Sequence, residues 1–171
     1  MLLCLPAFSC GTSQSITQTK FKSIKNFSET AMDEGKLQKL GITHVLNAAF
    51  GTKFYHVKTG PDYYCESGFI FHGIPAMDMF TFKLIKYFDE ACDFIGKAIG
   101  TKKTGKKNGK IFVHCREGVS RSVSLVLAYL VRDQDMELKD AVRLVRSKRE
   151  ISPNEGFLQQ LIEYSAKLGK A

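Results

Sequence analysis

The stretch Lys110–Ser122, KIFVHCREGVSRS, decides the fold of this chain. Its Ile111–Val113 run is β-branched and aromatic, which favours a strand buried on both faces. The apolar run that follows Arg121 contains neither Gly nor Pro, is too long for an ordinary strand and predicts a buried helix. Cys115–Ser120 therefore form a tight loop between a strand that ends at His114 and a helix N-terminus.

A tight loop followed by a helix N-terminus binds anions, because its backbone N–H groups converge on one point. Gly118 lets the loop curl without a Cβ penalty. The same positive field stabilises a thiolate over a thiol, so Cys115 is expected to react as a thiolate. The planar fork of Arg121 matches two oxygens of a phosphate. A thiolate beneath a bound phosphate is placed for in-line attack on phosphorus. The alternative is a cysteine that only fills the core, but such a cysteine would not require the spacing H-C-x-x-G-x-x-R-S.

The leaving oxygen of a phosphate ester also needs a proton, and Asp78 is the candidate donor. It follows a predicted strand at 69–74 and lies on a loop at the carboxyl edge of the sheet, where the sites of α/β proteins gather. Asp62 lies in a polar loop, and Asp89 and Asp93 lie on a predicted helix, so all three fit less well. A lone loop aspartate is otherwise a turn or cap residue, and the residues alone leave that alternative open.

The segment 113–122, VHCREGVSRS, resembles the signature of the cysteine-dependent protein tyrosine phosphatase superfamily, and within it the small dual-specificity phosphatases. Residues 147–161, SKREISPNEGFLQQL, and 37–49, LQKLGITHVLNAA, are similar to the VHR type of these enzymes. The resemblance extends over 35–168. It implies a single catalytic domain that hydrolyses phosphotyrosine and phosphoserine or phosphothreonine esters without a metal or another cofactor.

The resemblance agrees with the roles expected from the residues. Cys115 attacks phosphorus and carries the phosphate, and Asp78 protonates the leaving oxygen and then activates water. Ser122 hydrogen-bonds the sulfur and eases its departure, although a serine at this place is equally a helix cap. The phosphate is held by the guanidinium of Arg121 and by the backbone N–H groups of the loop, namely those of Arg116, Glu117, Gly118, Val119, Ser120 and Arg121.

Four residues outside the loop are expected to support it or to touch the substrate. His114 orients the loop from behind the cysteine and is not a base, because a thiolate needs none. Met77 neighbours Asp78 in the acid loop. By resemblance, Arg149 binds a second phosphate or an acidic side chain of the substrate, and Asn154 braces the loop. An arginine late in a helix is otherwise a partner of the helix dipole.

The loop's own side chains bear on the substrate class. Val119 stands where the VHR type carries tyrosine, so one aromatic wall of the pocket is missing and the preference for phosphotyrosine is open. A phosphoinositide phosphatase favours extra lysines here, whereas Arg116 is offset by Glu117 at the loop mouth. An RNA 5′-phosphatase is supported only by the lysine-rich segment 102–110. A phosphopeptide-binding module without turnover predicts loss of the cysteine, the arginine or the acid, and this chain has all three.

The order of elements predicts an α/β fold, a mixed central sheet flanked by helices, of the protein tyrosine phosphatase type. Strands are expected at 42–46 and 69–74, and helices at 82–99 (capped by Thr81), 121–132, 137–149 and after Pro153, the last with Phe157, Leu158, Leu161 and Ile162 facing inward. Residues 1–30 are expected to be a mobile tail and 31–171 the catalytic domain. Segment 21–37 lacks the glycine pattern of the family's first edge strand, which is therefore expected to be distorted or absent.

The 171 residues suffice for one domain, and no apolar run approaches the ~20 residues that span a bilayer. Much of the net charge of +8 comes from five lysines in 102–110. No aromatic residues interleave with these lysines, so nucleic acid and membranes are disfavoured as partners. Five irregularly spaced cysteines favour a reducing compartment, the cytoplasm or the nucleus. The expected partners are phosphoprotein substrates, protein kinases among them, and the oligomeric state is open.

Overall fold

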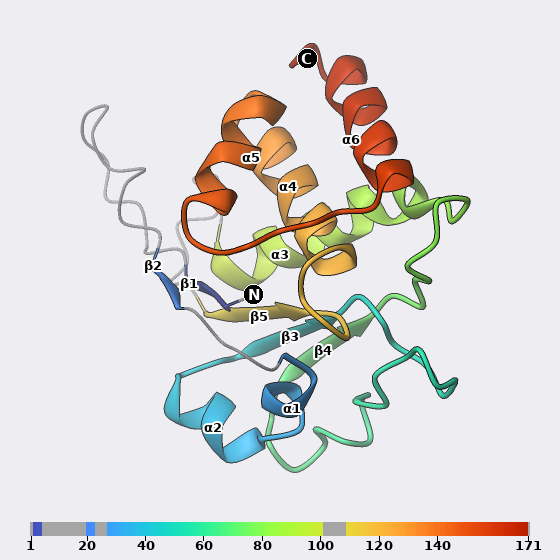
Figure 1. Cartoon of the computed structure of the whole chain (residues 1–171). Coiled ribbons are helices and arrows are strands. Elements are labelled where there is room, and N and C mark those ends of the chain that lie inside the picture. Colours follow the sequence, from blue (N-terminus) through green and yellow to red (C-terminus); the bar gives the residue numbers. More distant parts are fainter. Residues whose placement is uncertain (1, 5–19, 23–26, 101–108, 171) are drawn as a thin grey trace, which may run out of the picture.

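A mixed sheet lies at the centre of the computed structural model, which describes residues 2–4, 20–22, 27–100 and 109–170 (Figure 1). In this part of the chain the strand order is β2-β1-β5-β3-β4. The bounds are β1 Leu2–Cys4, β2 Lys20–Lys22, β3 His44–Asn47, β4 Ile70–Gly73 and β5 Ile111–His114. Strands β5, β3 and β4 are parallel, and β1 is antiparallel to both β5 and β2. The predicted fold class, a mixed sheet flanked by helices, is confirmed.

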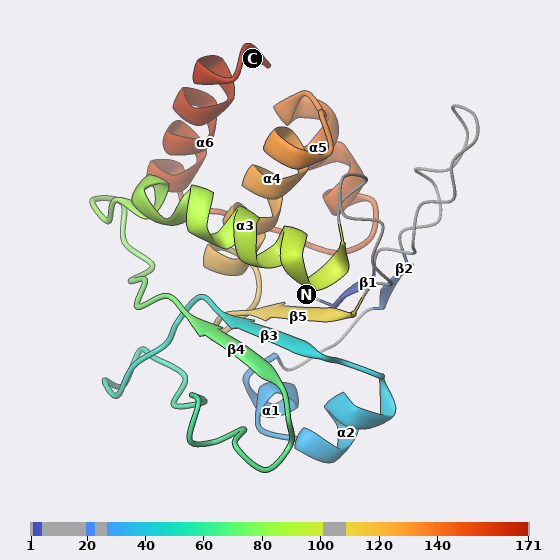
Figure 2. The same cartoon turned by 180° about the vertical axis from the view of Figure 1, so that it is seen from behind.

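One layer of helices lies on each face of the sheet (Figures 1 and 2). α3 (Phe88–Ile99), α4 (Arg121–Asp133), α5 (Leu138–Arg146) and α6 (Glu155–Lys167) cover one face, and the short helices α1 (Phe27–Ala31) and α2 (Glu34–Lys39) lie on the other. A 3₁₀ turn, η2 (Leu84–Tyr87), precedes α3. Every residue from the start of α4 to Val131 is buried, as expected for a helix with so continuous an apolar run.

The part of the chain predicted to be a mobile tail contains β1, β2 and the beginning of α1. The remainder of residues 1–30 lies outside the described residues, so the tail and the domain boundary at 31 stay predictions. Most of the lysine-rich segment 102–110 also lies outside them. Within the described ranges, no helix is both long enough and apolar enough to cross a bilayer.

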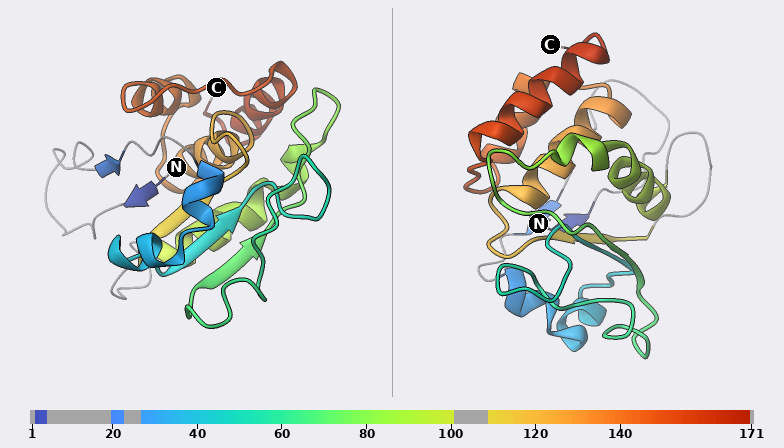
Figure 3. Two further views of the ribbon diagram at one scale, coloured as in Figure 1. Left: turned by 60° about the horizontal axis from the view of Figure 1, so that its bottom comes forward. Right: turned by 90° about the vertical axis from the view of Figure 1, so that its right-hand side faces the viewer.

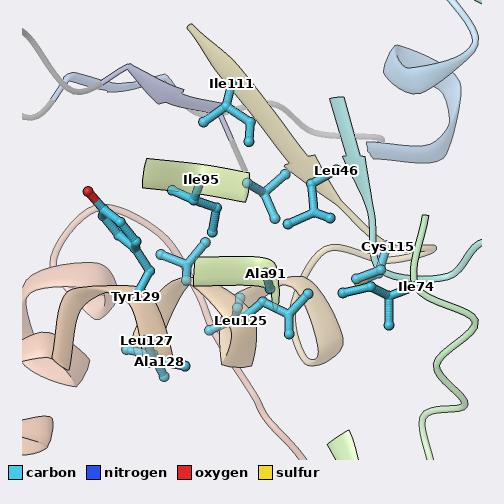
Figure 4. Packing of buried hydrophobic residues seen from close by; sticks show 14 of the residues in the cluster. Leu46, Ile74, Ala91, Ile95, Ile111, Cys115, Leu125, Leu127, Ala128 and Tyr129 are labelled. Atoms are coloured by element: carbon cyan, nitrogen blue, oxygen red, sulfur yellow. The ribbon is translucent and has the colours of Figure 1, made fainter. Parts of the chain in front are cut away.

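Strand register places the ends of the three parallel strands at one level. Asn47, the last residue of β3, pairs with Gly73 of β4 on one side and with His114 of β5 on the other. All four residues of β5 are buried, which confirms the strand predicted from the Ile111–Val113 run. Figure 4 shows the core beneath this edge, where Cys115 lies beside Ile74 at the end of the apolar cluster. The chain segments that leave these strands form the candidate site.

The predicted cap of one helix and the predicted inward face of another are wrong. Thr81 does not cap the helix after it: the 3₁₀ turn begins at Leu84, its N-cap residue Lys83 makes no side-chain cap, and the Ile85 N–H donates instead to Gln160 Oε1 of α6 (2.8 Å). A tertiary contact therefore takes the place of the local cap.

The inward face of α6 is the second error. Leu158 and Ile162 are 37% and 50% exposed, whereas Phe157 and Leu161 are buried as predicted. The buried side of α6 is completed by polar side chains, Gln160 and Ser165, which the apolar pattern does not reveal. An apolar residue at a helix surface is common, so hydrophobicity alone placed these two residues on the wrong face.

Candidate active site

The loop Cys115–Ser120 connects β5 to α4 at the edge where the parallel strands end (Figure 3). Gly118 has a φ of 77°, a conformation in which side chains are strained, so glycine lets the loop turn back on itself. The turn brings the Gly118 amide nitrogen to 3.2 Å from the sulfur of Cys115. In the described chain, the N–H groups of 116, 117, 119 and 120 donate to no backbone carbonyl. The loop is thus built as an anion-binding nest.

The sulfur of Cys115 lies at the base of this nest. The residue is 1% exposed, and its Sγ is 3.3 Å from the hydroxyl oxygen of Ser122 in the first turn of α4. A thiolate here accepts hydrogen bonds from the Ser122 hydroxyl and from the Gly118 amide. Both donors stabilise negative charge on sulfur, in line with the interaction expected for Ser122.

Arg121, also buried, links the loop to two other segments. Its Nη1 donates to the carbonyl oxygens of Ala76 (3.1 Å) and Tyr55 (3.4 Å). Its Nε lies 3.4 Å from Oδ2 of Asp78, a distance that makes an ion pair, although the N–H direction does not meet hydrogen-bond geometry. We regard this contact as electrostatic, because attraction between charges depends far less on angle than a hydrogen bond does. The arginine is therefore held between the acid loop and the loop after β3.

The carboxylate of Asp78 is fixed by two hydrogen bonds besides this ion pair. Its Oδ1 accepts from the hydroxyl of Ser120 and from Nδ2 of Asn154, both at 2.7 Å. The Ser120 hydroxyl accepts in turn from the backbone N–H of Asn154 (3.3 Å). Ser120 is the N-cap residue of α4, yet its side chain does not cap the helix, because the hydroxyl is directed to Asp78. The structure thus brings the predicted acid to the predicted nucleophile's loop.

His114 lies behind the loop with no exposed surface. Its ring stacks on Phe112 with centroids 5.2 Å apart, and its Nδ1 donates to the carbonyl oxygen of Cys115 (3.3 Å). Burial lowers the pKa of His114 to about 3. The imidazole is therefore neutral at ordinary pH, and its Nδ1–H points at the backbone of Cys115. This is the position behind the loop from which His114 was expected to orient it.

The lowered pKa of His114 predicts a fold that weakens in mild acid. The unfolded chain protonates this histidine below about pH 6.5, whereas the folded chain protonates it only near pH 3. The contribution of His114 to the free energy of unfolding is therefore complete above about pH 6.5 and declines as the pH falls below that value. A single such group costs about 2 kcal/mol of unfolding free energy between about pH 7 and about pH 5. We expect urea titrations to show this loss in the wild type and a smaller loss in His114→Gln.

Burial also lowers the pKa values of His44 and His56. These two histidines therefore weaken the fold in acid in the wild type and in His114→Gln alike. The difference between wild type and His114→Gln therefore isolates His114. Equal pH dependence in the two proteins would show that the histidine is not kept neutral by the fold.

The remaining predicted residues lie around the nest. Arg116 is exposed and donates from Nη1 to the carbonyl oxygen of Phe54 (2.8 Å), and Glu117 is exposed beside it. The carbonyl of half-buried Val119 accepts from the N–H of Ser152 (2.9 Å). Half-buried Met77 lies between two residues that contact Arg121.

Arg149 lies beyond α5, which ends at Arg146 rather than at the predicted 149. Burial lowers the pKa of the Arg149 guanidinium, and the neighbouring Cys115 acts in the opposite direction. The Nε of Arg149 donates to the carbonyl oxygen of Glu150 (3.1 Å), and its contact with a substrate stays a prediction. Arg149 also lies outside the last turn of the helix, where a dipole partner would be expected.

Sequence reasoning missed the segment after β3. Asn47, buried at the end of that strand, donates from Nδ2 to the carbonyls of Val57 and Thr59 and accepts at Oδ1 from the N–H of Ala49. These bonds close the segment into a loop whose Phe54 and Tyr55 carbonyls meet the two arginines of the nest. The available signal was a buried asparagine at the carboxyl end of a parallel strand, where polar residues gather at sites.

Comparison with known proteins agrees with this geometry. Residues 24–167 match the model of the dual specificity phosphatase catalytic domain. The crystal structure of human DUSP28 is 25% identical, with 83% of this chain and 86% of that chain covered and a TM-score of 0.67. The human tyrosine phosphatase-like serine/threonine/tyrosine-interacting protein is 29% identical over 78% of this chain and 85% of its own, with a TM-score of 0.58.

A crystal structure of a mouse putative dual specificity phosphatase is similar in fold, with 24% identity, 94% of each chain covered and a TM-score of 0.66. The family model covers well over half of the chain, and the structural matches agree with it. The chain therefore belongs to the dual specificity phosphatase catalytic-domain family and is an atypical dual-specificity phosphatase of the protein tyrosine phosphatase superfamily.

Proposed function

We propose that this chain removes phosphate from phosphotyrosine and from phosphoserine or phosphothreonine in proteins, through a cysteinyl-phosphate intermediate. One observation carries the proposal: the buried sulfur of Cys115 lies inside an anion-binding turn, 3.2 Å from the Gly118 amide nitrogen and 3.3 Å from Ser122 Oγ. Arg121 and Asp78 form an ion pair at the same loop. Nucleophile, anion-binding group and proton donor thus converge on one point.

In the first step, the thiolate of Cys115 attacks phosphorus and the bond from phosphorus to the leaving oxygen breaks. Asp78 gives its proton to that oxygen, so the product leaves as an alcohol or a phenol. The nest N–H groups and the guanidinium of Arg121 hold the remaining phosphate oxygens as negative charge spreads over them. The product of the step is a phosphate bound to sulfur.

In the second step, a water molecule attacks the same phosphorus on the side that the alcohol has left. Asp78, now a carboxylate, takes a proton from this water, and the phosphorus–sulfur bond breaks. The electron pair returns to Cys115, whose sulfur accepts hydrogen bonds from Ser122 and Gly118. Inorganic phosphate is released and the thiolate is restored.

Side chains at the mouth of the nest favour a phosphate carried on a peptide. Exposed Glu117 can accept hydrogen bonds from a substrate backbone, and Arg149 supplies a cation for a second phosphate or an acidic side chain. Val119 leaves one wall of the pocket aliphatic, while Phe54, 85% exposed, lies on the loop that Arg116 binds. An exposed aromatic residue at the rim can pack against the ring of phosphotyrosine.

The alternatives are less well supported. A ligand with several phosphates calls for more positive charge than a nest in which Arg116 stands next to Glu117 and donates to a carbonyl. A phosphopeptide-binding module without turnover does not require the cysteine, the arginine and the acid together. We also propose phosphoproteins, protein kinases among them, as partners, and the cytoplasm or nucleus as the location. Cys65, Cys92 and Cys115 form no disulfide in the described chain, which agrees with that location.

The test is hydrolysis of an aryl phosphate and of matched phosphotyrosine and phosphothreonine peptides, with a chelator present, from about pH 4 to about pH 9. The expected result is turnover on the acidic side of neutrality that is unaffected by the chelator, with phosphate released from both peptides. A folded protein that binds the peptides without releasing phosphate would overturn the proposal in favour of the binding module.

A further inference from the structure

The loop that carries Asp78 rests on the first two turns of α6, as Figures 1 and 3 show. Four residues of the loop and the turn after it, from Asp78 to Ile85, contact this helix or its cap. The contacts come from the N-cap residue Asn154 and from Gly156 and Gln160 in the first two turns of α6. Helix α6 therefore forms a surface beneath the loop on which the proposed acid lies.

Gln160 makes the most extensive of these contacts. Its side chain is almost fully buried, at 6% exposed, and each polar atom of the amide is used. Oε1 accepts from the N–H of Ile85 (2.8 Å), and Nε2 donates to the carbonyls of Phe82 and Gly156 (2.9 Å each). A buried amide that satisfies three backbone groups holds them in one geometry, because losing any of these bonds leaves a polar group unpaired.

Gly156 permits the closest approach between the loop and the helix. A Cβ atom at this position would lie 2.1 Å from the carbonyl oxygen of Phe80, and within 3 Å of its carbonyl carbon and its Cα. These are backbone atoms, which cannot rotate away as a side chain can. The backbone of the acid loop therefore lies directly on the helix, and only glycine fits between them.

We propose that Gln160 and Gly156 are positioning residues for Asp78, and that α6 holds the acid loop at the phosphate nest as a fixed element of the site. The inference rests on the proposed function, in which Asp78 is the proton donor. Asn154 completes the attachment at the carboxylate itself, through its 2.7 Å hydrogen bond to Oδ1. The loop is anchored at its acid, its middle and its exit, so displacement of the helix surface moves the proton donor away from the leaving oxygen.

Two substitutions test this inference. Gln160→Met keeps the length of the side chain but removes its hydrogen bonds, and Gly156→Ala forces the loop away from the helix. Gln159→Met is the matched control, because Gln159 is exposed and adjacent on the same helix. Each protein is assayed with phenyl phosphate, a poor leaving group, and with a nitrophenyl phosphate, which leaves with little help. The ratio of the two kcat/KM values does not depend on the fraction of folded protein.

We expect both variants to lower this ratio about 10- to 100-fold, since small displacements of a catalytic group have effects of that size. The Gln159→Met control should keep the wild-type ratio. In an Asp78→Asn background, Gln160→Met should change the ratio no further, because its effect passes through the acid. A loss that is equal on both substrates, or a ratio that changes further in that background, would overturn the inference. Failure of the wild type to hydrolyse either substrate would instead contradict the proposed function.

Discussion

Replacement of Cys115 by serine is expected to abolish turnover while leaving the fold and the binding of phosphate intact. An alcohol is a weak nucleophile unless a base removes its proton. The imidazole of the adjacent His114 cannot serve, because it is buried and its Nδ1 donates to the carbonyl of residue 115. We expect hydrolysis of aryl phosphates to fall by at least about 10⁴-fold, the order seen when a nucleophile is removed.

Binding should persist because the groups that hold phosphate are unchanged in the Cys115→Ser variant. Arg121 and the N–H groups of the nest remain, and the serine hydroxyl fits where the thiol was. Titration calorimetry with inorganic phosphate measures this directly. Cys65→Ser is the matched control, since that cysteine is exposed and unbridged, and it should keep wild-type turnover. Residual normal turnover in the Cys115 variant would mean that another group is the nucleophile.

Replacement of Asp78 by asparagine is expected to separate substrates by their leaving groups. The amide cannot donate the proton that a poor leaving group needs, so hydrolysis of phenyl phosphate should fall by about 10²- to 10⁴-fold. A nitrophenolate leaves without that proton, so its release should fall much less. The amide oxygen can still accept from Ser120 and Asn154, which preserves the local geometry, while the ion pair to Arg121 is lost.

The measurement is kcat for a series of aryl phosphates whose leaving phenols differ in acidity. In the wild type the dependence on the phenol should be shallow, and in Asp78→Asn it should be steep. Asp62→Asn is the control, since Asp62 is an exposed aspartate of the polar loop after β3. Parallel lines for wild type and Asp78→Asn would remove Asp78 from the acid role and reopen its interpretation as a turn residue.

The two expected results depend on features that the sequence indicates to different degrees. The loop from His114 to Arg121 was predictable, because a buried strand, a six-residue loop and a buried helix follow one another directly in the chain. Local sequence sets this geometry: Gly118 supplies the turn, and the apolar run supplies the helix. The position of Asp78 at the same edge was also predictable, since the carboxyl ends of parallel strands meet there.

The attachment of the acid loop was not predictable from the pattern. Thr81 was the plausible cap for the helix after that loop, yet the free N–H of Ile85 is satisfied by Gln160, 75 residues further along the chain. Likewise, Ser120 has the position of a helix cap but donates to Asp78 instead. In both cases a polar side chain has a local and a distant partner available, and only the packed structure decides between them.

The choice of the buried face of α6 also depended on tertiary contacts rather than on the local sequence. The apolar pattern placed Leu158 and Ile162 inside, whereas the structure buries Gln160 and leaves those two residues exposed. A glutamine is buried only where backbone groups satisfy it, and here these groups belong to the acid loop, brought to α6 by the fold.

The sequence by itself therefore determined the nucleophile's loop, the candidate acid and the three parallel strands with the helices that follow them, because these depend on neighbours in the chain and on hydrophobic periodicity. It did not indicate β1 and β2, which lie in the segment predicted to be a tail. Tertiary structure alone decided how the acid is held: Asp78, Ser120 and Asn154 come from three separate segments that meet only after the sheet and α6 have packed. Hydrogen bonds between such segments leave no periodic trace in a sequence, since their partners are set by distance in space.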